Sequence, residues 1–423
     1  MMEILNKIFF RSNNLKDINA EFLELKRKTG VEQIFNAIEN YSEKGEIRYV
    51  GGCVRKILQK QKVNDIDLAT NLIPEEVIEV LKKNKIKYYE TGLKHGTVTA
   101  LINNYKFEIT SLRKDVKTDG RHADVVFTND WKEDASRRDF SINSIYSDLR
   151  GNLFDPFNGK KDLENGIVNF IGNPEKRIRE DYLRILRYIR FFLNYSKLKH
   201  DENVIKIIKM NLDGFSKISS DRLLDEFKKL LISDGFLNLA NDEFCYEIIN
   251  LIFPQFKNIS FIKNLNKYAK ENIKNVDFIF LISLMIIDGS DNVEYFIYKF
   301  NISKKDKKRI LFLNDYFKNK NSKIFNTKDL WKVLYFNGKE SLTDLINFQI
   351  FKSKKIDKKL LNLLDFFKDK EAPLMPLRAI TLMTKYKIPE GKDLGLKLKK
   401  IENKWVDNNF EISEKEVQNL INN

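Results

Sequence analysis

The fold of this 423-residue chain is indicated first by the stretch Tyr49–Thr70, which reads YVGGCVRKILQKQKVNDIDLAT. Gly51 and Gly52 follow a short apolar run and precede a helical pattern, and glycines at such a turn let the backbone approach a phosphate closely. Asp65 and Asp67 stand two apart, so in a strand their carboxylates lie on the same face. Adjacent carboxylates repel unless a cation lies between them, and Mg²⁺ prefers such oxygen ligands together with substrate phosphates.

Arg55, three residues after the glycines, adds a charged donor for the same phosphates. The stretch therefore predicts a metal-dependent site for a nucleoside triphosphate. It is not a Walker P-loop, because no Gly-Lys pair followed by Ser or Thr occurs in the sequence. An Asp pair in a turn and a Gly pair before a helix also occur without any ligand, so the stretch alone leaves a purely structural role open.

Further blocks follow in a fixed order along the chain. They read LRKDVKTDGRHADVVFTNDWKEDASRRDFSINS (Leu112–Ser144), DPFNG (Asp155–Gly159) and EDYLRILRYIRF (Glu180–Phe191). With the first stretch, these blocks resemble the class II tRNA nucleotidyltransferases, the CCA-adding enzymes of the class II poly(A) polymerase superfamily. The resemblance covers residues 49–192 and is fainter over DRLLDEFKKLL (Asp221–Leu231). Lys56 departs from it, since the family usually has Asp there, and we assign Lys56 no role.

The resemblance implies an α+β fold, with a polymerase-β-like nucleotidyltransferase head of mixed sheet and helices followed by an all-α neck, body and tail. We expect a helical cap over residues 1–47, the head over 48–150, a base-selecting and RNA-binding neck over 151–240, and a tRNA-binding body and tail over 241–423. Patterns of apolar residues predict strands at Arg48–Val50, Asp67–Ala69, Thr97–Ile102, Lys106–Thr110 and Ser144–Tyr146. Helical patterns include Val54–Gln59, Pro74–Lys83, Ile178–Tyr195, Asp201–Met210, Ser219–Ser233 and Asp242–Ile252.

The implied reaction is template-independent addition of C, C and A to the 3′ end of tRNA from CTP and ATP. In it an RNA hydroxyl attacks the α-phosphate and pyrophosphate leaves. Asp65 and Asp67 would be catalytic and hold two Mg²⁺ ions. Glu108, which alternates with apolar neighbours in its strand, is our candidate for a third catalytic carboxylate, and a solvent-facing strand residue is the alternative.

Nucleotide-binding roles come from the same resemblance. It implies that Arg138 contacts the triphosphate, to which Gly51, Gly52 and Arg55 are already assigned from the first stretch. It also implies that Asp139 and Asn143 shape the sugar pocket. For Arg138, the neighbouring Arg137 makes a plain surface patch the alternative.

Base selection is expected from the block that begins at Glu180. On one helix, Asp181 and Arg184 are i and i+3 and so lie on one face. The carboxylate can accept a hydrogen bond from the amino group of cytosine or adenine, and the guanidinium can donate one to the ring nitrogen beside it. Guanine and uracil present the reverse pattern, so such a pair can discriminate against them by a factor on the order of 10⁴. Arg187 and Arg190 continue the series toward base or phosphate, or brace the pocket. A salt bridge without any ligand is the alternative for the first pair.

Composition sets limits on partners and compartment. The formal net charge of +15 fits a nucleic-acid partner, although a Lys-, Asn- and Ile-rich chain also reflects AT-rich coding. Two cysteines, Cys53 and Cys245, give no disulfide framework, and no apolar run reaches membrane-spanning length, so we expect a cytoplasmic protein without a membrane partner. Three histidines argue against a His-rich metallohydrolase domain.

Other functions stay open from the sequence. The same blocks occur in poly(A) polymerases and in enzymes that add only the terminal A or only the two Cs; the acidic end Glu411–Asn423 favours a tRNA enzyme over a poly(A) polymerase. A non-catalytic RNA-binding protein is disfavoured by the intact Asp65 and Asp67. A small-molecule nucleotidyltransferase would not need the basic helical half. The sequence does not fix the oligomeric state.

Overall fold

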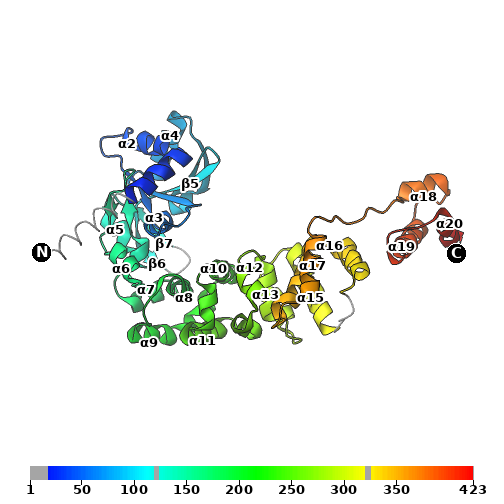
Figure 1. Cartoon of the computed structure of the whole chain (residues 1–423). Helices are drawn as coiled ribbons and strands as arrows, with labels where there is room; N and C mark the ends of the chain where they lie inside the picture. The colour runs from blue at the N-terminus through cyan, green and yellow to red at the C-terminus, as the bar shows by residue number, and fades with distance from the viewer. Residues whose placement is uncertain (1–17, 119–122, 320–324, 423) are drawn as a thin grey trace. The chain divides into compact units, whose positions relative to one another are not determined.

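The computed structural model describes residues 18–118, 123–319 and 325–422, and it divides into two units, residues 1–252 and 253–423. Strands are confined to the first unit, drawn from blue to green in Figure 1, within the residues that the structure describes. The expected α+β class, a mixed-sheet head followed by helices, is confirmed. Residues 1–17 of the expected N-terminal cap lie outside the described residues.

The sheet has seven strands in the order β3-β4-β5-β2-β1-β8-β9, and a separate hairpin pairs β6 with β7. These strands are β1 (Ile47–Val50), β2 (Ile66–Thr70), β3 (Lys87–Gly92), β4 (Thr97–Ile102), β5 (Tyr105–Ser111), β6 (Arg113–Thr118), β7 (Ala123–Phe127), β8 (Tyr146–Ser147) and β9 (Leu153–Phe154). In the large sheet β2 and β5 run parallel, and the other neighbours are antiparallel.

Two of these pairings position the site. β1 runs antiparallel to β2 with Tyr49 opposite Leu68, so the end of β1 lies beside the start of β2. β2 runs parallel to β5 with Asp67 opposite Glu108. The chain thus brings the glycine turn, the aspartates and Glu108 to one region of the sheet.

Helices of the head cover the sheet and bury its apolar side chains. They are α2 (Glu32–Glu39), α3 (Gly52–Leu58), α4 (Pro74–Lys83), α5 (Trp131–Ser136) and α6 (Gly159–Asn165), with 3₁₀ turns η1 (Leu93–His95) and η2 (Ser141–Asn143). Tyr49 of β1 is fully buried between the rings of Phe22 and Phe35, whose centroids lie 5.2 and 5.0 Å away. The preceding helical segment, residues 18–29, is therefore part of the head core.

Most predicted strands are found, with one shift and several additions. β8 begins at Tyr146 instead of Ser144, because Ser141–Asn143 first forms a 3₁₀ turn and Ser144 ends it. β3, β6, β7 and β9 were not predicted. β3 is an edge strand whose side chains are mostly exposed, so it lacks the apolar alternation that reveals a half-buried strand.

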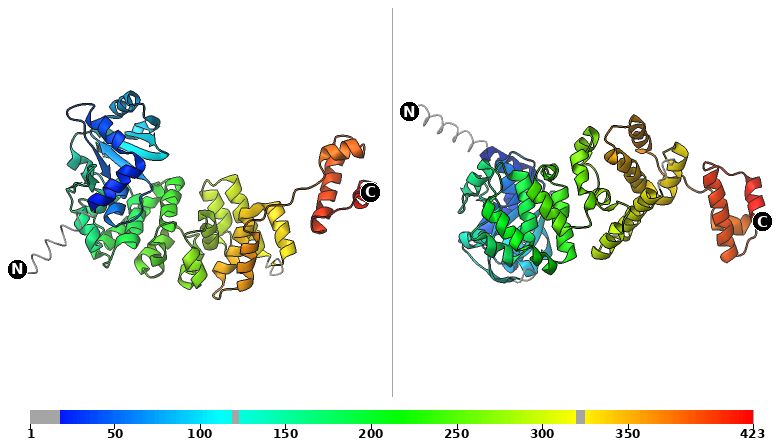
Figure 2. Two further views of the ribbon diagram at one scale, coloured as in Figure 1. Left: turned by 45° about the horizontal axis from the view of Figure 1, so that its top comes forward. Right: turned by 90° about the horizontal axis from the view of Figure 1, so that it is seen from below.

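The rest of the first unit consists of short helices, and Figure 2 shows the chain from two further sides. They are α7 (Pro174–Glu180), α8 (Leu183–Tyr195), α9 (Glu202–Met210), η3 (Leu212–Lys217), α10 (Ser220–Leu231), η4 (Phe236–Ala240) and α11 (Glu243–Ile252). The expectation of one continuous helix over Ile178–Tyr195 is wrong. Asp181 has extended backbone angles, φ −154° and ψ 105°, and so separates α7 from α8.

The second unit is helical throughout its described part. Its elements are η5 (Lys257–Asn264), α12 (Lys267–Asn272), α13 (Phe278–Ile286), α14 (Asn292–Lys299), α15 (Lys304–Lys318), α16 (Thr327–Lys352), α17 (Lys358–Phe367), α18 (Ala379–Lys385), α19 (Lys392–Asp407) and α20 (Glu414–Asn422). α13 is apolar on all sides and is buried from Ile279 to Ile286. Among the described residues, no helix combines the length and apolar content needed to cross a bilayer.

Candidate nucleotide-binding and catalytic site

The glycine turn lies directly beside the two aspartates. Gly51 has φ +68°, a conformation that side-chain-bearing residues rarely adopt, and a Cβ on Gly52 would lie 3.8 Å from Oδ2 of Asp67. Asp65 is exposed just before β2, and Asp67 is half-buried on that strand. Both aspartates and both glycines line one cavity of about 1150 Å³. The predicted grouping of these residues is therefore present.

Glu108 adds a third carboxylate next to this pair. It stands opposite Asp67 in the parallel register and is exposed. Burial and the negative charge of Glu108 raise the pKa of Asp67 to about 6, although the nearby Arg138 acts in the opposite direction. Carboxylates gathered in this way disfavour ionisation unless a cation is bound. Asp65, Asp67 and Glu108 thus form an oxygen-rich set that fits a divalent metal ion.

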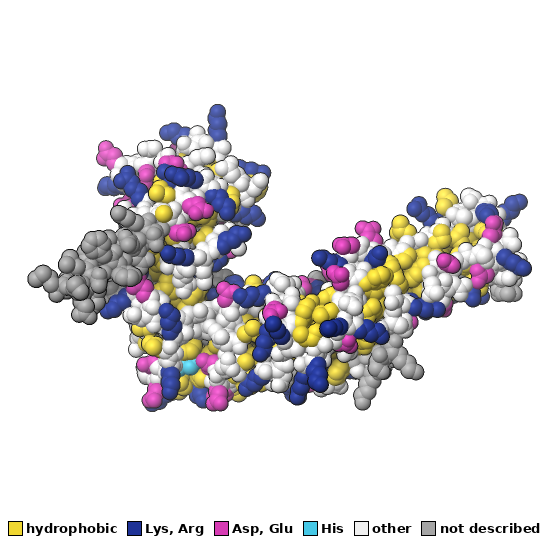
Figure 3. All heavy atoms as spheres, in the orientation of Figure 1, with side chains coloured by type: hydrophobic (Ala, Val, Ile, Leu, Met, Phe, Trp, Pro, Cys, Tyr) yellow, Lys and Arg dark blue, Asp and Glu magenta, His cyan; other side chains and the backbone are white. Residues whose placement is uncertain are grey.

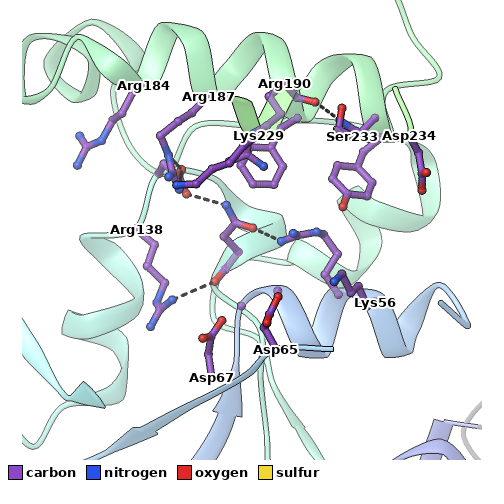
Figure 4. Close-up of a pocket in the computed structure, with 18 of the residues that line it drawn as sticks. Lys56, Asp65, Asp67, Arg138, Arg184, Arg187, Arg190, Lys229, Ser233 and Asp234 are labelled. Carbon is purple, nitrogen blue, oxygen red and sulfur yellow. Dashed lines mark hydrogen bonds and ion pairs between the residues drawn. The ribbon is translucent and has the colours of Figure 1, made fainter. Parts of the chain in front are cut away.

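Arg138 lies beside Asp67 in the cavity (Figure 4). Its guanidinium donates to Oδ2 of Asp134 at 3.2 Å and to the Tyr146 hydroxyl at 3.1 Å. Asp134 is 1% exposed and also binds Arg137 at 2.7 Å. Burial alone would raise the pKa of Asp134, but the two guanidinium groups and the Tyr146 hydroxyl lower it to about 2. Arg138 is therefore held in place by a buried, ionised carboxylate.

A second buried network joins the head to helix α8. The Asn143 side-chain amide donates to Oδ1 of Asp139 at 2.8 Å and accepts a hydrogen bond from Arg55. The other oxygen of Asp139 accepts from Arg187 at 2.6–2.7 Å. Arg187 and Asn143 outweigh burial and hold the pKa of Asp139 well below its usual value. Asp139 and Asn143 thus line the cavity while fixing two arginines that also line it.

Helix α8 presents its arginines to the cavity with partners from α10. Arg190 donates to Oε1 of Glu226 at 2.5 Å, and Arg187 lies 3.8 Å from the other oxygen of the same carboxylate. Glu226 is almost fully buried. The Arg190 guanidinium also lies over the Phe191 ring, 4.4 Å from its centroid. Arg190 therefore braces the cavity wall as well as lining it.

The expectation that Asp181 and Arg184 share one helical face is wrong. Asp181 stands between two helices, because its carboxylate accepts a hydrogen bond from the Leu183 backbone at the start of α8. Its other oxygen pairs with Arg222 of α10 at 2.7 Å. Arg184 instead pairs with Glu180 at 2.7 Å. Both residues still line the cavity, so the structure brings them together in one site by a different route.

Sequence reasoning missed four residues that hold these side chains. Asp134, Tyr146 and Glu226 are buried, and Arg222 lines the cavity. Asp134 stands in the block that contains Arg138, and Tyr146 follows two residues after that block ends; Arg222 and Glu226 stand in the fainter block that begins at Asp221. Helical spacing could have indicated the pairs of Asp134 with Arg137 and Arg138, but not the contacts of Glu226 and Arg222, which join residues up to 41 positions apart.

The cavity is strongly basic overall. Ten Lys or Arg side chains line it against five Asp residues, and Lys56 is among the basic ones. A basic wall facing a carboxylate cluster suits a polyanion bound together with a metal ion. Lys and Arg side chains are also spread over the visible surface of both units (Figure 3), in keeping with the net charge of +15.

Comparison with known proteins decides the family. Residues 47–169 match the Poly A polymerase head domain. Human CCA tRNA nucleotidyltransferase 1, mitochondrial, is 36% identical over 303 residues, 69% of this chain and 65% of the relative. Its mouse counterpart is 33% identical over 398 residues, 90% of this chain and 87% of the relative. The chain belongs to the class II CCA-adding tRNA nucleotidyltransferases. The resemblance read from the sequence is thereby confirmed.

The fold agrees with this family. The crystal structure of the Bacillus stearothermophilus CCA-adding enzyme in complex with CTP superimposes with a TM-score of 0.67 at 20% identity, covering 92% of this chain and 95% of that one. CCA-adding nucleotidyltransferases generally use a divalent metal ion, and the carboxylates of Asp65, Asp67 and Glu108 fit that requirement. As a member of this family, the protein is a nucleotidyltransferase enzyme.

Proposed function

We propose that this protein adds C, C and A to the 3′ end of tRNA from CTP and ATP and releases pyrophosphate. One observation carries the proposal. In a chain of the CCA-adding family, a carboxylate cluster and a row of fixed arginines face each other across one cavity. The carboxylates suit metal binding and the arginines suit a triphosphate, which are the two requirements of nucleotidyl transfer.

The proposed metal is Mg²⁺, held by Asp65 and Asp67 with Glu108 beside them. When bound, such ions lower the pKa of the attacking RNA hydroxyl and offset the charge of the leaving pyrophosphate. Arg138, whose position Asp134 fixes, would neutralise charge on the triphosphate. No side-chain nucleophile is required, because the RNA hydroxyl forms the new bond to the α-phosphate as the bond to pyrophosphate breaks.

Nucleotide choice would come from Asp181 and Arg184. Cytosine and adenine each offer an amino donor beside a ring-nitrogen acceptor, which a carboxylate and a guanidinium can bind. In the structure these groups pair with Arg222 and Glu180. An incoming base would therefore exchange partners with protein groups, and a base of the wrong pattern would leave buried polar groups unpaired. Arg187 and Arg190 would support this wall and the triphosphate.

The supporting head and neck belong to one unit, whereas the basic helices of the second unit are proposed to contact tRNA phosphates. A tRNA-binding role predicts that affinity falls steeply with rising salt, because each neutralised phosphate releases counterions.

For localisation we propose the cytoplasm, since both cysteines are free and buried, as suits a reducing compartment. The mitochondrial names of the two relatives make that organelle the alternative outcome of a localisation experiment.

An extension assay tests the function. Purified protein and Mg²⁺ are mixed with tRNA transcripts that lack CCA, end in C, or end in CC, with CTP and ATP supplied singly and together. We expect three additions followed by a stop, and loss of all incorporation in Asp65→Ala, Asp67→Ala. Addition of A alone to the CC-ending transcript, of Cs alone, or of long A tails would replace the proposal with an A-adding enzyme, a CC-adding enzyme or a poly(A) polymerase.

A further inference from the structure

A second group of potential metal ligands lies among the later helices of the first unit, and its residues do not line the nucleotide cavity. His200 stands in the segment between α8 and α9, Asp242 directly precedes α11, and Cys245 is in the first turn of α11. One ligand atom from each of the three lies within 4.8 Å of the others. The side chains of His200 and Asp242 are 9% and 18% exposed, and Cys245 is fully buried.

The distances among these atoms match those around a tetrahedral zinc ion. Nε2 of His200 lies 3.0 and 3.2 Å from the two oxygens of Asp242. The same nitrogen lies 3.6 Å from Sγ of Cys245. With zinc bonds of about 2.0 Å to nitrogen or oxygen and about 2.3 Å to sulfur, tetrahedral geometry separates the ligands by about 3.3 Å and about 3.5 Å, respectively. The two separations measured from the His200 nitrogen are therefore within a few tenths of an ångström of these values, and the carboxylate and the thiol lie within 4.8 Å of each other.

The surroundings of His200 also suit a ligand. Its second ring nitrogen, Nδ1, lies 3.0 Å from the Tyr188 hydroxyl, so the ring is held from the side opposite the cluster. The ring stacks on Phe192 with centroids 3.5 Å apart and meets the edge of Phe244. A hydrogen bond to the far nitrogen and a packed apolar shell are the usual ways in which proteins orient a metal-binding imidazole.

A metal-free arrangement is the competing explanation. Asp242 accepts a hydrogen bond from the backbone N–H of Cys245 at 2.8 Å, which caps the start of α11, and its carboxylate also hydrogen-bonds Nε2 of His200. In this arrangement the Cys245 thiol also hydrogen-bonds the Asp242 carboxylate, which holds the three side chains together without an ion. The same contacts nevertheless bring one sulfur, one nitrogen and one oxygen within 4.8 Å of one another, and this is a donor set that zinc accepts.

We propose that Nε2 of His200, a carboxylate oxygen of Asp242 and Sγ of Cys245 bind Zn²⁺, with water as the fourth ligand. Binding would convert the thiol to a thiolate and release its proton to solvent. The ion would tie the segment after α8 to the start of α11. The site differs in chemistry from the carboxylate set at Asp65 and Asp67, because a thiolate favours zinc over magnesium.

The experiment uses the full-length chain carrying Asp65→Ala and Asp67→Ala, which removes the other metal site. The protein is purified without chelators or metal-affinity resin, and its zinc content is measured by mass spectrometry. We expect one zinc ion per chain, and a lower melting temperature after chelation that added Zn²⁺ restores. Replacement by Co²⁺ should give a thiolate-to-cobalt charge-transfer band, which only a sulfur ligand produces.

Two variants identify the ligand. Cys245→Ser should lose the zinc and the cobalt band, whereas Cys53→Ser, which alters the other buried cysteine, should keep both. The proposal would be overturned if the zinc content is at background level and neither chelator nor added Zn²⁺ changes the melting temperature. Zinc retained by folded Cys245→Ser would overturn the ligand set. If Cys245→Ser does not fold, the cobalt spectrum of the parent protein still decides the question, because its absence contradicts a sulfur ligand.

Discussion

Replacing Asp134 by Asn should weaken both the fold and triphosphate binding. The substitution preserves shape but removes a negative charge that is 1% exposed and serves Arg137, Arg138 and the Tyr146 hydroxyl. The pKa of this carboxyl is about 2, against an ordinary value of 3.8. A shift of that size corresponds to roughly 2.5 kcal/mol. Removing one partner of a buried ion pair costs about 3–5 kcal/mol, so we expect a loss of about 3 kcal/mol.

The assay is urea unfolding of the parent chain and of the Asp134→Asn variant, with Glu133→Gln as the control. Glu133, on the same helix, makes only a long contact of 3.7 Å to the half-exposed Lys114 and a hydrogen bond to Thr128, so its variant should lose no more than about 1 kcal/mol. In nucleotide addition, Asp134→Asn should raise KM for CTP and ATP more than it lowers the affinity for tRNA, because Arg138 loses its anchor.

The difference in free energy of unfolding between the parent and Asp134→Asn should become smaller as the pH falls. The pKa of Asp134 is lower in the folded chain than in the unfolded one, so its contribution is complete above about pH 4 and is lost as the pH falls toward 2. The stability gap should therefore be constant from pH 7 to 5 and narrow at pH 3. A gap below about 0.5 kcal/mol at pH 7, or one that widens at pH 3, would refute the idea that an ionised Asp134 holds Arg138.

Three other substitutions test separate parts of the structure. Glu226→Gln should cost about 3 kcal/mol and lower kcat, because Arg190 loses a buried partner at 2.5 Å; unchanged urea unfolding would contradict this role. Lys56→Asp, which restores the residue usual in the family, should raise KM for nucleotide by removing positive charge from the cavity wall, and an equal or lower KM would show that Lys56 is not near the triphosphate. Gly159→Ala should markedly lower the melting temperature, since its Cβ would lie 2.1 Å from the Ser141 carbonyl oxygen; Gly395→Ala, with open space around it, is the matched control and should leave the melting temperature nearly unchanged.

The parts of the site that depend on local sequence could be predicted. The glycine turn and the Asp65–Asp67 pair lie within 17 residues of each other, and backbone geometry alone places them at the end of one strand and the start of its neighbour. Glu108 was expected from strand alternation, but its position beside Asp67 required the parallel pairing of β2 with β5. Strand order depends on packing across the whole head, which no short window contains.

Helix α8 shows where local reasoning failed. The apolar repeat runs without interruption through Asp181, so periodicity predicts one helix over Ile178–Tyr195. The break arises because Asp181 bonds the start of α8 and pairs with Arg222, 41 residues further along. Likewise, the burial of Asp134 and Glu226 depends on partners in other elements. Sequence patterns report an average tendency, whereas a charged residue that is stabilised by distant partners departs from it.

The ion pairs of the cavity's arginines affect the entropy cost of binding one nucleotide after another. Arg184, Arg187, Arg190 and Arg222 each already rest against a carboxylate of the protein. Side chains held in this way have little rotamer freedom left to lose when a nucleotide arrives. Arg187 and Arg190, which are not proposed to exchange partners with the base, would therefore keep the same positions for successive nucleotides, because the entropy of ordering them is lost once, when the chain folds. It follows that warming should abolish nucleotide choice and the fold over the same narrow temperature range, with no interval in which a folded enzyme adds the wrong base.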